Sequence, residues 1–258
     1  DHNLVPVADY AKKLINQGMI LGNSAFIYRL NGSDKYFSYG LVKDKNVQAI
    51  HVDIKFVNSN NELNIDELKN WQPQFSNSKF ELENNKFFVK REVEKMSKSK
   101  YNVVNPDDIC DKYGADTLRL YEMFLGPIDQ AKPWNTAGIT GTFSFLNKFW
   151  NLFYKNDIFL INDQEPSKDE LKILHKTINK VSQDIENFSF NTAVSAFMIC
   201  VNELNSLNCN NRLILKDLCV LLSPFAPHIC EELWNKLGNN QSISKVNYPI
   251  FNPEFIKE

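Results

Sequence analysis

The sequence lacks features that define several common protein classes. None of its apolar runs approaches the roughly 20 residues that a membrane-spanning helix requires. Basic and acidic residues nearly balance, with 29 Lys and Arg against 31 Asp and Glu, so there is no surface-wide positive charge for nucleic acid. These absences exclude a membrane protein, and they restrict any contact with an anionic partner to a local patch.

Cysteine is scarce and follows no ligand pattern. The five cysteines are odd in number, and no two of them form a CxxC pair. A disulfide framework or a zinc ribbon is therefore not expected. No HExxH motif occurs either, so we expect no metal site formed by the protein. This cysteine usage fits a reducing, cytoplasmic location.

Arginine is rare while Lys and Asn are common, which we interpret as codon bias of an AT-rich genome rather than as function. The chain begins at Asp1 instead of Met, which we interpret as a sign that it is a piece of a longer protein. The other values, 43% hydrophobic and 23% charged residues, are typical of globular proteins. The length suits one large domain or two to three compact ones.

The first part of the chain has a mixed pattern. Apolar residues at helical spacing over 4–17 predict an amphipathic helix that ends at Gly18. Residues 30–90 alternate between polar clusters and short apolar stretches, which indicates a small inserted α+β module. The elements predicted within this module are a strand over 47–57, a helix over 65–71, and a hairpin of 80–83 and 86–89 around Asn84-Asn85.

The second part is predicted to be helical. After a basic loop over 91–100, Asn105-Pro106 begins a short helix that Gly114 ends, and a second helix follows over 116–125. From residue 138, apolar residues at intervals of three and four predict five helices with short loops, typical of an antiparallel bundle. Ser167 and Glu170 have the spacing of a capping box. Residues 238–258, with two prolines and few helix formers, are predicted to be a linker.

One segment of the basic loop has the residue types needed to bind phosphate groups. It places two ammonium groups three residues apart, with hydroxyls on either side of the second, so it can close over a polyphosphate. Charge that moves onto a pyrophosphate leaving group is then stabilised in the transition state. On composition alone, a solvated basic loop before a helix is the ordinary alternative. The segment is Lys95-Met96-Ser97-Lys98-Ser99.

This pentapeptide, followed by a helix that starts at Asn-Pro, resembles the second ATP-binding signature of the class I aminoacyl-tRNA synthetases. Three further features resemble the leucyl members of that family. The first is Gln17-Gly18-Met19 together with the module that is inserted between it and the signature. The second is the pair of segments 123–127 and 132–134. The third is the set of bundle segments around 138–150, 175–178, 190–193 and 223–228. Residues 112–120 resemble the segment that joins the family's catalytic domain to its bundle.

The resemblance implies a reaction and its participants. Leucine would be activated with ATP to leucyl-adenylate and transferred to tRNA(Leu), with Mg²⁺ accompanying the ATP, by a monomer without membrane contact. Lys98 would be the catalytic residue of this piece, and the ATP phosphates would be contacted by Lys95, Met96, Ser97, Lys98 and Ser99. The bundle residues implied in tRNA binding are Lys148, Lys172, Lys176 and Lys180. The other ATP signature of the family, of HIGH type, is missing, so this chain is not expected to activate leucine alone.

The resemblance also implies a multidomain fold: the end of a Rossmann-type catalytic domain with a small α+β insertion, followed by an all-α antiparallel helical bundle. The expected ranges are the catalytic end at 1–29, the leucine-specific insertion at 30–90, the signature loop and stem-contact region at 91–134, the anticodon-binding-type bundle at 135–237, and a linker toward a further domain at 238–258.

Three alternatives stay open at this point. The chain could belong to an isoleucyl, valyl or methionyl synthetase, although the insertion directly before the signature argues against these. It could be a non-catalytic RNA-binding module descended from a synthetase, or a structural helical scaffold. Both leave the intact signature loop without a purpose.

Overall fold

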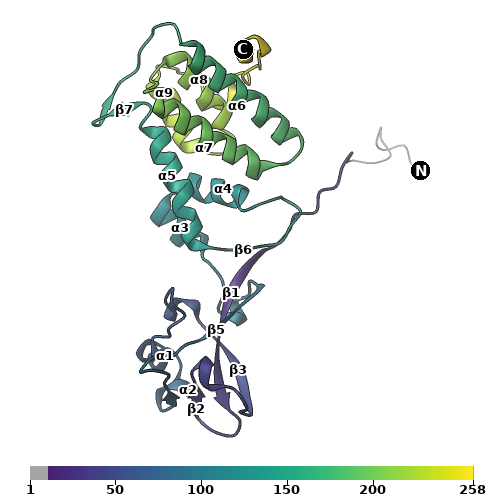
Figure 1. Cartoon of the computed structure of the whole chain (residues 1–258), viewed down its shortest axis with the longest axis vertical. Helices are drawn as coiled ribbons and strands as arrows, with labels where there is room; N and C mark the ends of the chain where they lie inside the picture. The colour runs from purple at the N-terminus through teal and green to yellow at the C-terminus, as the bar shows by residue number, and fades with distance from the viewer. Residues whose placement is uncertain (1–10, 258) are drawn as a thin grey trace, which may run out of the picture. The chain divides into compact units, whose positions relative to one another are not determined.

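The computed structural model describes residues 11–257, and the chain divides into two compact units. The sheet unit comprises Met19–Asn105 and Ala131–Trp134, and the helical unit comprises, of the described residues, 11–18, Pro106–Gln130 and 135–257. The first has α+β and the second all-α character apart from one two-stranded ribbon, which confirms the expected fold class (Figure 1).

Strand β1 (Ile20–Leu30) organises the sheet unit because both of its edges are paired. On one edge, β1 pairs with β6 (Lys132–Pro133), which is parallel, and with β3 (Val47–Val52), which is antiparallel. On the other edge it pairs with β5 (Lys90–Lys95) and β2 (Lys35–Phe37), both antiparallel. Strand β4 (Lys79–Glu81) then pairs with β2 in the parallel direction. The boundary expected between the catalytic end (1–29) and the insertion (30–90) therefore lies inside β1, and residues of both ranges belong to one sheet.

Local capping explains where the elements between β3 and β4 begin and end. The helix predicted over 65–71 is confirmed as α1 (Ile65–Trp71), and the Asn64 side chain starts it by accepting a hydrogen bond from the Glu67 N–H. The strand predicted over 47–57 ends early, at Val52. There the Asp53 carboxylate accepts from the Lys55 N–H and turns the chain into the 3₁₀ helix η2 (Ile54–Phe56). A further short helix, α2, covers Pro73–Ser76.

The predicted hairpin around Asn84-Asn85 exists only as a turn. Both asparagines have positive φ, and the backbones of Glu83 and Lys86 exchange hydrogen bonds of 2.8 and 3.0 Å. The following residues pair elsewhere: the Leu63 N–H donates to the Phe87 carbonyl at 2.8 Å. Phe87 is almost fully buried, so its place in the core of the sheet unit decides the pairing.

The helical unit contains the predicted helices with small shifts of their ends. They are α3 (Pro106–Tyr113), α4 (Ala115–Phe124), α5 (Ile139–Trp150), α6 (Lys168–Glu186), α7 (Phe190–Ser206), α8 (Arg212–Leu222) and α9 (Pro227–Lys236), and the ribbon of β7 (Tyr154–Lys155) and β8 (Ile158–Phe159) follows α5. The capping box is confirmed, because Ser167 and Glu170 bond each other's backbone N–H. Gly114, at φ +86°, separates α3 from α4.

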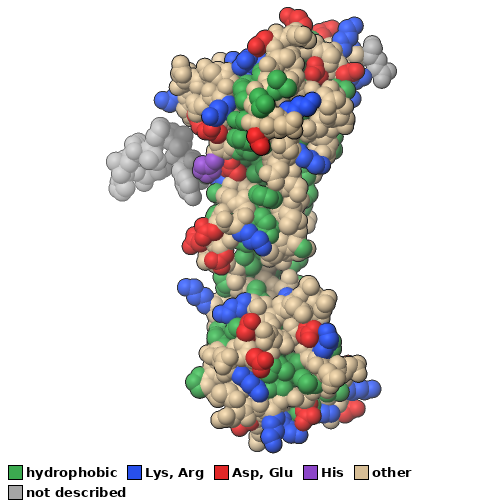
Figure 2. Space-filling view, turned by 90° about the vertical axis from the view of Figure 1, so that its left-hand side faces the viewer, with side chains coloured by type: hydrophobic (Ala, Val, Ile, Leu, Met, Phe, Trp, Pro, Cys, Tyr) green, Lys and Arg blue, Asp and Glu red, His purple; other side chains and the backbone are tan. Residues whose placement is uncertain are grey.

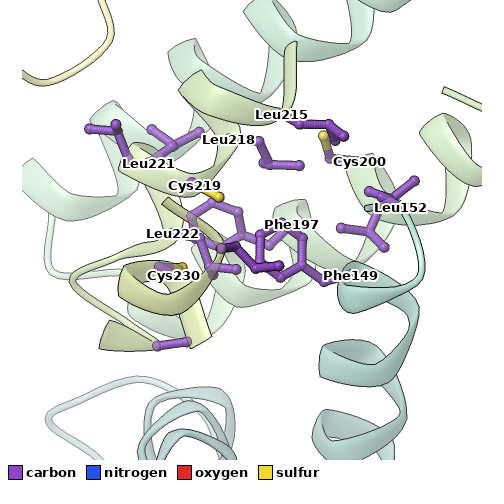
Figure 3. Close-up of a cluster of buried hydrophobic side chains, with 14 of the residues drawn as sticks. Phe149, Leu152, Phe197, Cys200, Leu215, Leu218, Cys219, Leu221, Leu222 and Cys230 are labelled. Atoms are coloured by element: carbon purple, nitrogen blue, oxygen red, sulfur yellow. The ribbon is translucent and has the colours of Figure 1, made fainter. Parts of the chain in front are cut away.

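One continuous core holds α5 to α9 together. Figure 3 shows Phe149, Phe197 and Leu218 converging between the helices, with cysteine side chains among them. All five cysteines are free, and burial raises the pKa of the Cys200 thiol to about 12. The thiols of Cys200 and Cys219, whose pKa values are raised by burial, are therefore neutral packing groups, since a buried thiolate is disfavoured.

Two predictions about the chain's ends are corrected. Residues 11–17 form no helix, and Leu14 is 84% exposed, because the apolar stripe predicted over 4–17 has no surface to cover there; residues 4–10 lie outside the described part. Residues 238–257 do not form a free linker. Ile243 is buried in the helical core, and the Phe255 ring stacks on His175 of α6 at 4.6 Å. His175 is accordingly only 8% exposed.

Candidate active site

The segment Lys95–Lys100, here called the lysine loop, leaves the sheet at the end of β5. The sequence predicts a basic loop over the whole of 91–100, but β5 continues to Lys95, which pairs with Leu21 of β1. After Met96 and Ser97, the 3₁₀ helix η3 (Lys98–Lys100) forms one tight turn. The signature residues are thus held at the end of a central strand pair rather than on a free loop.

A buried asparagine fixes the shape of the lysine loop. Asn102 has no exposed surface. Its Oδ1 accepts from the Ser97 N–H at 2.8 Å, and its Nδ2 donates to the Lys95 carbonyl at 3.3 Å and to Ser24 Oγ at 2.9 Å. One carboxamide therefore joins both flanks of Met96 to β1. Each such bond adds about 1 kcal/mol net, and an orphaned partner costs more.

Close approach of the lysine loop to β1 requires a glycine at position 22. A Cβ built on Gly22 would lie 2.5 Å from the Asn102 carbonyl oxygen and 3.0 Å from Met96 Cγ. Real Cβ atoms do not approach backbone oxygens so closely, so any side chain here would push the loop outward.

The charges of the lysine loop fall into two groups. Lys95 and Lys98 are exposed, and neither ammonium forms an ion pair with any residue in the described range 11–257. Lys100 instead bonds Glu94 Oε1 at 2.6 Å, while His51 Nε2 lies 2.8 Å from Glu94 Oε2. Two cations of the loop therefore stay available to an anionic ligand, and the third is used to hold the loop.

The Glu94 carboxylate is stabilised in its charged form. The hydrogen bond from Lys100 is the main cause, and bonds from the Ser24 and His51 side chains add to it. Together they lower the pKa of Glu94 from 4.5 to about 2. The hydroxyls of Ser97 and Ser99, the two residues that flank Lys98 in the chain, lie 2.8 Å apart. This arrangement can bind and orient a polyphosphate by charge and by hydroxyl donors.

Tyr101 closes the turn in an unusual backbone conformation. Its φ of 51° and ψ of 34° are left-handed, which costs an L-residue with a Cβ roughly 1–2 kcal/mol. Among the described non-glycine residues with positive φ, all except Tyr101 and Phe188 are Asn or Asp. Contacts of its ring and carbonyl with Trp71, Gln72 and Ile54 hold it there.

The bundle lysines proposed from the sequence lie in the helical unit, separate from the lysine loop. Lys172, Lys176 and Lys180 share one row of α6, and Lys148 lies on α5. Lys180 pairs with Asp184 at 2.6 Å, and Lys148 donates to Asn202 Oδ1 at 2.9 Å. Figure 2 shows Lys and Arg side chains interspersed with Asp and Glu on its visible face of each unit, in line with the balanced composition.

His228, at the start of α9, has a partner in Asp116 that no sequence motif indicated. This buried carboxylate of α4 accepts from His228 Nδ1 at 2.9 Å and from the backbone N–H groups of His228 and Ile229. The signal in the sequence was the start of α9 at Ala226-Pro227, which lacks a capping side chain of its own. A groove of about 670 Å³ beside this contact is bordered by Tyr113, Phe143 and Trp150.

Within 11–257, no three His, Cys, Asp or Glu side chains gather as they would around a metal ion. In that same range, none of the helices combines the length and the apolar character needed to cross a bilayer.

Comparison with known proteins supplies the family context. A family model described as "tRNA synthetases class I (I, L, M and V)" matches residues 81–134, and one described as "Anticodon-binding domain of tRNA ligase" matches residues 168–258. Among curated relatives, leucine–tRNA ligases of Flavobacterium psychrophilum, Christiangramia forsetii and Cytophaga hutchinsonii are 60%, 58% and 55% identical over 100% of this chain. The chain spans only 27–28% of the length of these relatives.

A solved structure gives a consistent result. The ternary complex of Agrobacterium radiobacter K84 agnB2 LeuRS with tRNA and LeuAMS contains a chain similar to this one, with a TM-score of 0.53 and 30% sequence identity. The similarity covers 64% of this chain and 23% of that chain.

Proposed function

Because this chain belongs to the class I aminoacyl-tRNA synthetases and is homologous over its whole length to part of the leucine–tRNA ligases, we propose that it serves leucine activation and leucyl transfer to tRNA(Leu). The observation that carries the proposal is the lysine loop. It holds two exposed ammonium groups, Lys95 and Lys98, that form no ion pair within the described part of the chain, and it lies inside the segment that matches the class I model.

In the proposed reaction, a carboxylate oxygen of leucine attacks the α-phosphorus of ATP. The bond from that phosphorus to the bridging oxygen breaks, and pyrophosphate leaves with the electron pair. Lys98, supported by Lys95, neutralises the charge that grows on the departing phosphates, and the hydroxyls of Ser97 and Ser99 donate hydrogen bonds to them. Stabilisation that increases toward the transition state raises kcat. Met96 is proposed to act through its backbone, which sets the spacing between the side chains of Lys95 and Lys98.

In the second step, a terminal ribose hydroxyl of tRNA attacks the leucyl carbonyl carbon and AMP leaves. Mg²⁺ is proposed to arrive with the ATP phosphates. The lysine loop presents cations and hydroxyls but no carboxylate, so the loop itself offers Mg²⁺ no ligand of the kind that it prefers. The leucine pocket is proposed to lie in the rest of the longer protein.

The helical unit is proposed to bind tRNA, with Lys148, Lys172 and Lys176 as candidate phosphate contacts. The match of residues 168–258 to an anticodon-binding model supports this assignment. The proposed ranges remain 1–29, 30–90, 91–134 and 135–237, with the qualification that β1 places parts of the first two in one sheet. The range expected as a linker is not kept, because Ile243 lies in the core of the helical unit.

The experiment is leucine-dependent ATP–pyrophosphate exchange by the full-length parent, with isoleucine, valine and methionine tested separately. Lys98→Ala should lower the exchange rate about 10²-fold or more through kcat, with the KM for leucine little changed. Lys79→Ala is the matched control, because Lys79 is also exposed in the sheet unit but lies on β4. An unchanged rate in Lys98→Ala would contradict the role of the loop.

The outcome with each amino acid also separates the alternatives. Exchange that depends on another amino acid would keep the class but change the substrate. No exchange with any of the four, together with retained tRNA binding, would favour a non-catalytic RNA-binding module.

A further inference from the structure

The lysine loop is attached to the rest of the sheet unit at two adjacent residues that point in different directions. Asn102 bonds inward to β1 through Ser24. Tyr101 contacts elements that follow β3 in the chain, namely η2 and α1. The second attachment is not part of the signature and has no role in the reaction as proposed above.

The contacts of Tyr101 involve its backbone and its whole side chain. The ring meets Trp71 edge to face, with centroids 4.7 Å apart and planes at 84°. The Gln72 Nε2 donates to the Tyr101 hydroxyl at 3.4 Å, and the Ile54 N–H donates to the Tyr101 carbonyl at 3.2 Å. All three partners lie in the segment 54–72, between β3 and β4.

The support behind Tyr101 is rigid. Trp71 also packs edge to face on Phe56 at 5.4 Å and stacks on Phe75 at 6.2 Å, and both of these rings are buried in the core of the sheet unit. A ring held by two buried rings has little freedom to move. Trp71 can therefore maintain a strained neighbour in one conformation.

The strained backbone of Tyr101 indicates a functional constraint at this residue. A left-handed tyrosine persists only where its surroundings over-determine it, and such residues cluster at ligand-binding and switch segments. Tyr101 directly follows η3, which contains Lys98. Its backbone N–H donates to the Lys98 carbonyl at 3.3 Å, so the conformation of Tyr101 fixes the turn that presents the Lys98 ammonium.

We propose that Tyr101, held by Trp71, is a positioning residue that fixes the lysine loop in the conformation in which Lys98 reaches the pyrophosphate leaving group. Through this contact, the segment 54–72 contributes to the rate of leucine activation without touching a substrate. The inference rests on the proposed function for its kinetic consequence, but the coupling of Trp71 to the loop can be measured without any activity.

The test uses a double-mutant cycle in the full-length parent. Tyr101→Gly removes the ring and accepts positive φ freely, and Trp71→Leu removes the partner from outside the loop. Each should lower kcat for leucine-dependent ATP–pyrophosphate exchange about ten-fold, with the KM for leucine unchanged, and the double variant should be no worse than either single one. Phe87→Leu is the control, because it opens the same core at a buried ring whose aromatic contact is with Phe80 rather than with Trp71.

A second measurement is independent of catalysis. Amide hydrogen exchange of the segment 95–104 should accelerate in Trp71→Leu and in Tyr101→Gly, but not in Phe87→Leu. Equal exchange in all three variants, or additive losses of kcat, would overturn the positioning role. If the parent shows no leucine-dependent exchange while the amide result holds, the proposed function fails and the coupling of Trp71 to the loop stands.

Discussion

The carboxylate of Asp116 accepts a 2.7 Å hydrogen bond from the backbone N–H of Ile229, which lies 113 positions later in the chain. This contact, with those to His228, gives α9 the cap that Ala226 does not provide. A negative charge at the positive end of the helix dipole adds to the stabilisation. The first turn of α4 and the first turn of α9 are thereby fixed to each other within the helical unit.

Replacing Asp116 tests the energy of this cap. Asp116→Ala should lower the free energy of unfolding of the helical unit by about 2 kcal/mol, because buried N–H groups lose their acceptor. Asp116→Asn should lower it less, since one acceptor oxygen remains. Thermal unfolding followed by circular dichroism measures both. Asp111→Ala, at an exposed acid of α3, is the control and should change little.

The Glu94 carboxylate makes the free energy of unfolding of the sheet unit depend on pH. Its pKa is about 2 in the folded chain against an ordinary 4.5, with the hydrogen bond from Lys100 as the main cause. Because the folded pKa is the lower one, the stabilisation is present above pH 4.5 and is lost as the pH falls from 4.5 toward 2. Glu94→Gln should therefore reduce the melting temperature at pH 7, and its deficit should shrink through this window.

The control for Glu94 is Glu92→Gln on the same strand. Glu92 pairs with Lys90, but both side chains are substantially exposed, and such pairs contribute little. A melting-temperature difference between Glu94→Gln and the wild type that stays constant from pH 7 to about 2 would contradict the linkage.

The contribution of the Asn102 carboxamide to stability can be tested by substitution. Asn102→Ala should cost about 2–3 kcal/mol of stability, because the Ser97 N–H and the Lys95 carbonyl lose a buried partner. Asn102→Asp should cost at least as much, since a carboxylate cannot donate to that carbonyl. Denaturant unfolding measures both variants. Asn60→Ala, at an exposed turn, should be neutral, and a neutral Asn102→Asp would show that the Nδ2 bonds contribute nothing.

The helices could be predicted from the sequence because their signals are local. Ser167 with Glu170, Asn64 before α1, and Gly114 after α3 each act within one turn of the residue that they affect. The spacing of apolar residues then indicated which face of each bundle helix is buried.

The sheet could not be predicted in the same way. β5 consists mainly of charged residues and resembles a loop, and it becomes a strand only because β1, far away in sequence, offers a free edge. The signature residues of the candidate site were visible in the sequence, but their supports were not. Asn102 and Ser24 are 78 positions apart, and the contact of Tyr101 with Trp71 depends on the position of α1.

Salt dependence can identify which bundle lysines contact tRNA in the full-length parent. A lysine that neutralises a phosphate adds about 1 to the slope of log K against log salt, measured between about 50 and 200 mM. Lys172→Ala and Lys176→Ala should each weaken binding and reduce the slope by about that amount. Lys180→Ala is the matched comparison on the same row of α6. Its ammonium is already bonded to the buried Asp184 at 2.6 Å, so its loss should leave the slope unchanged. A slope that falls for Lys180→Ala but not for Lys172→Ala or Lys176→Ala would place the tRNA backbone beyond the Asp184 end of the helix.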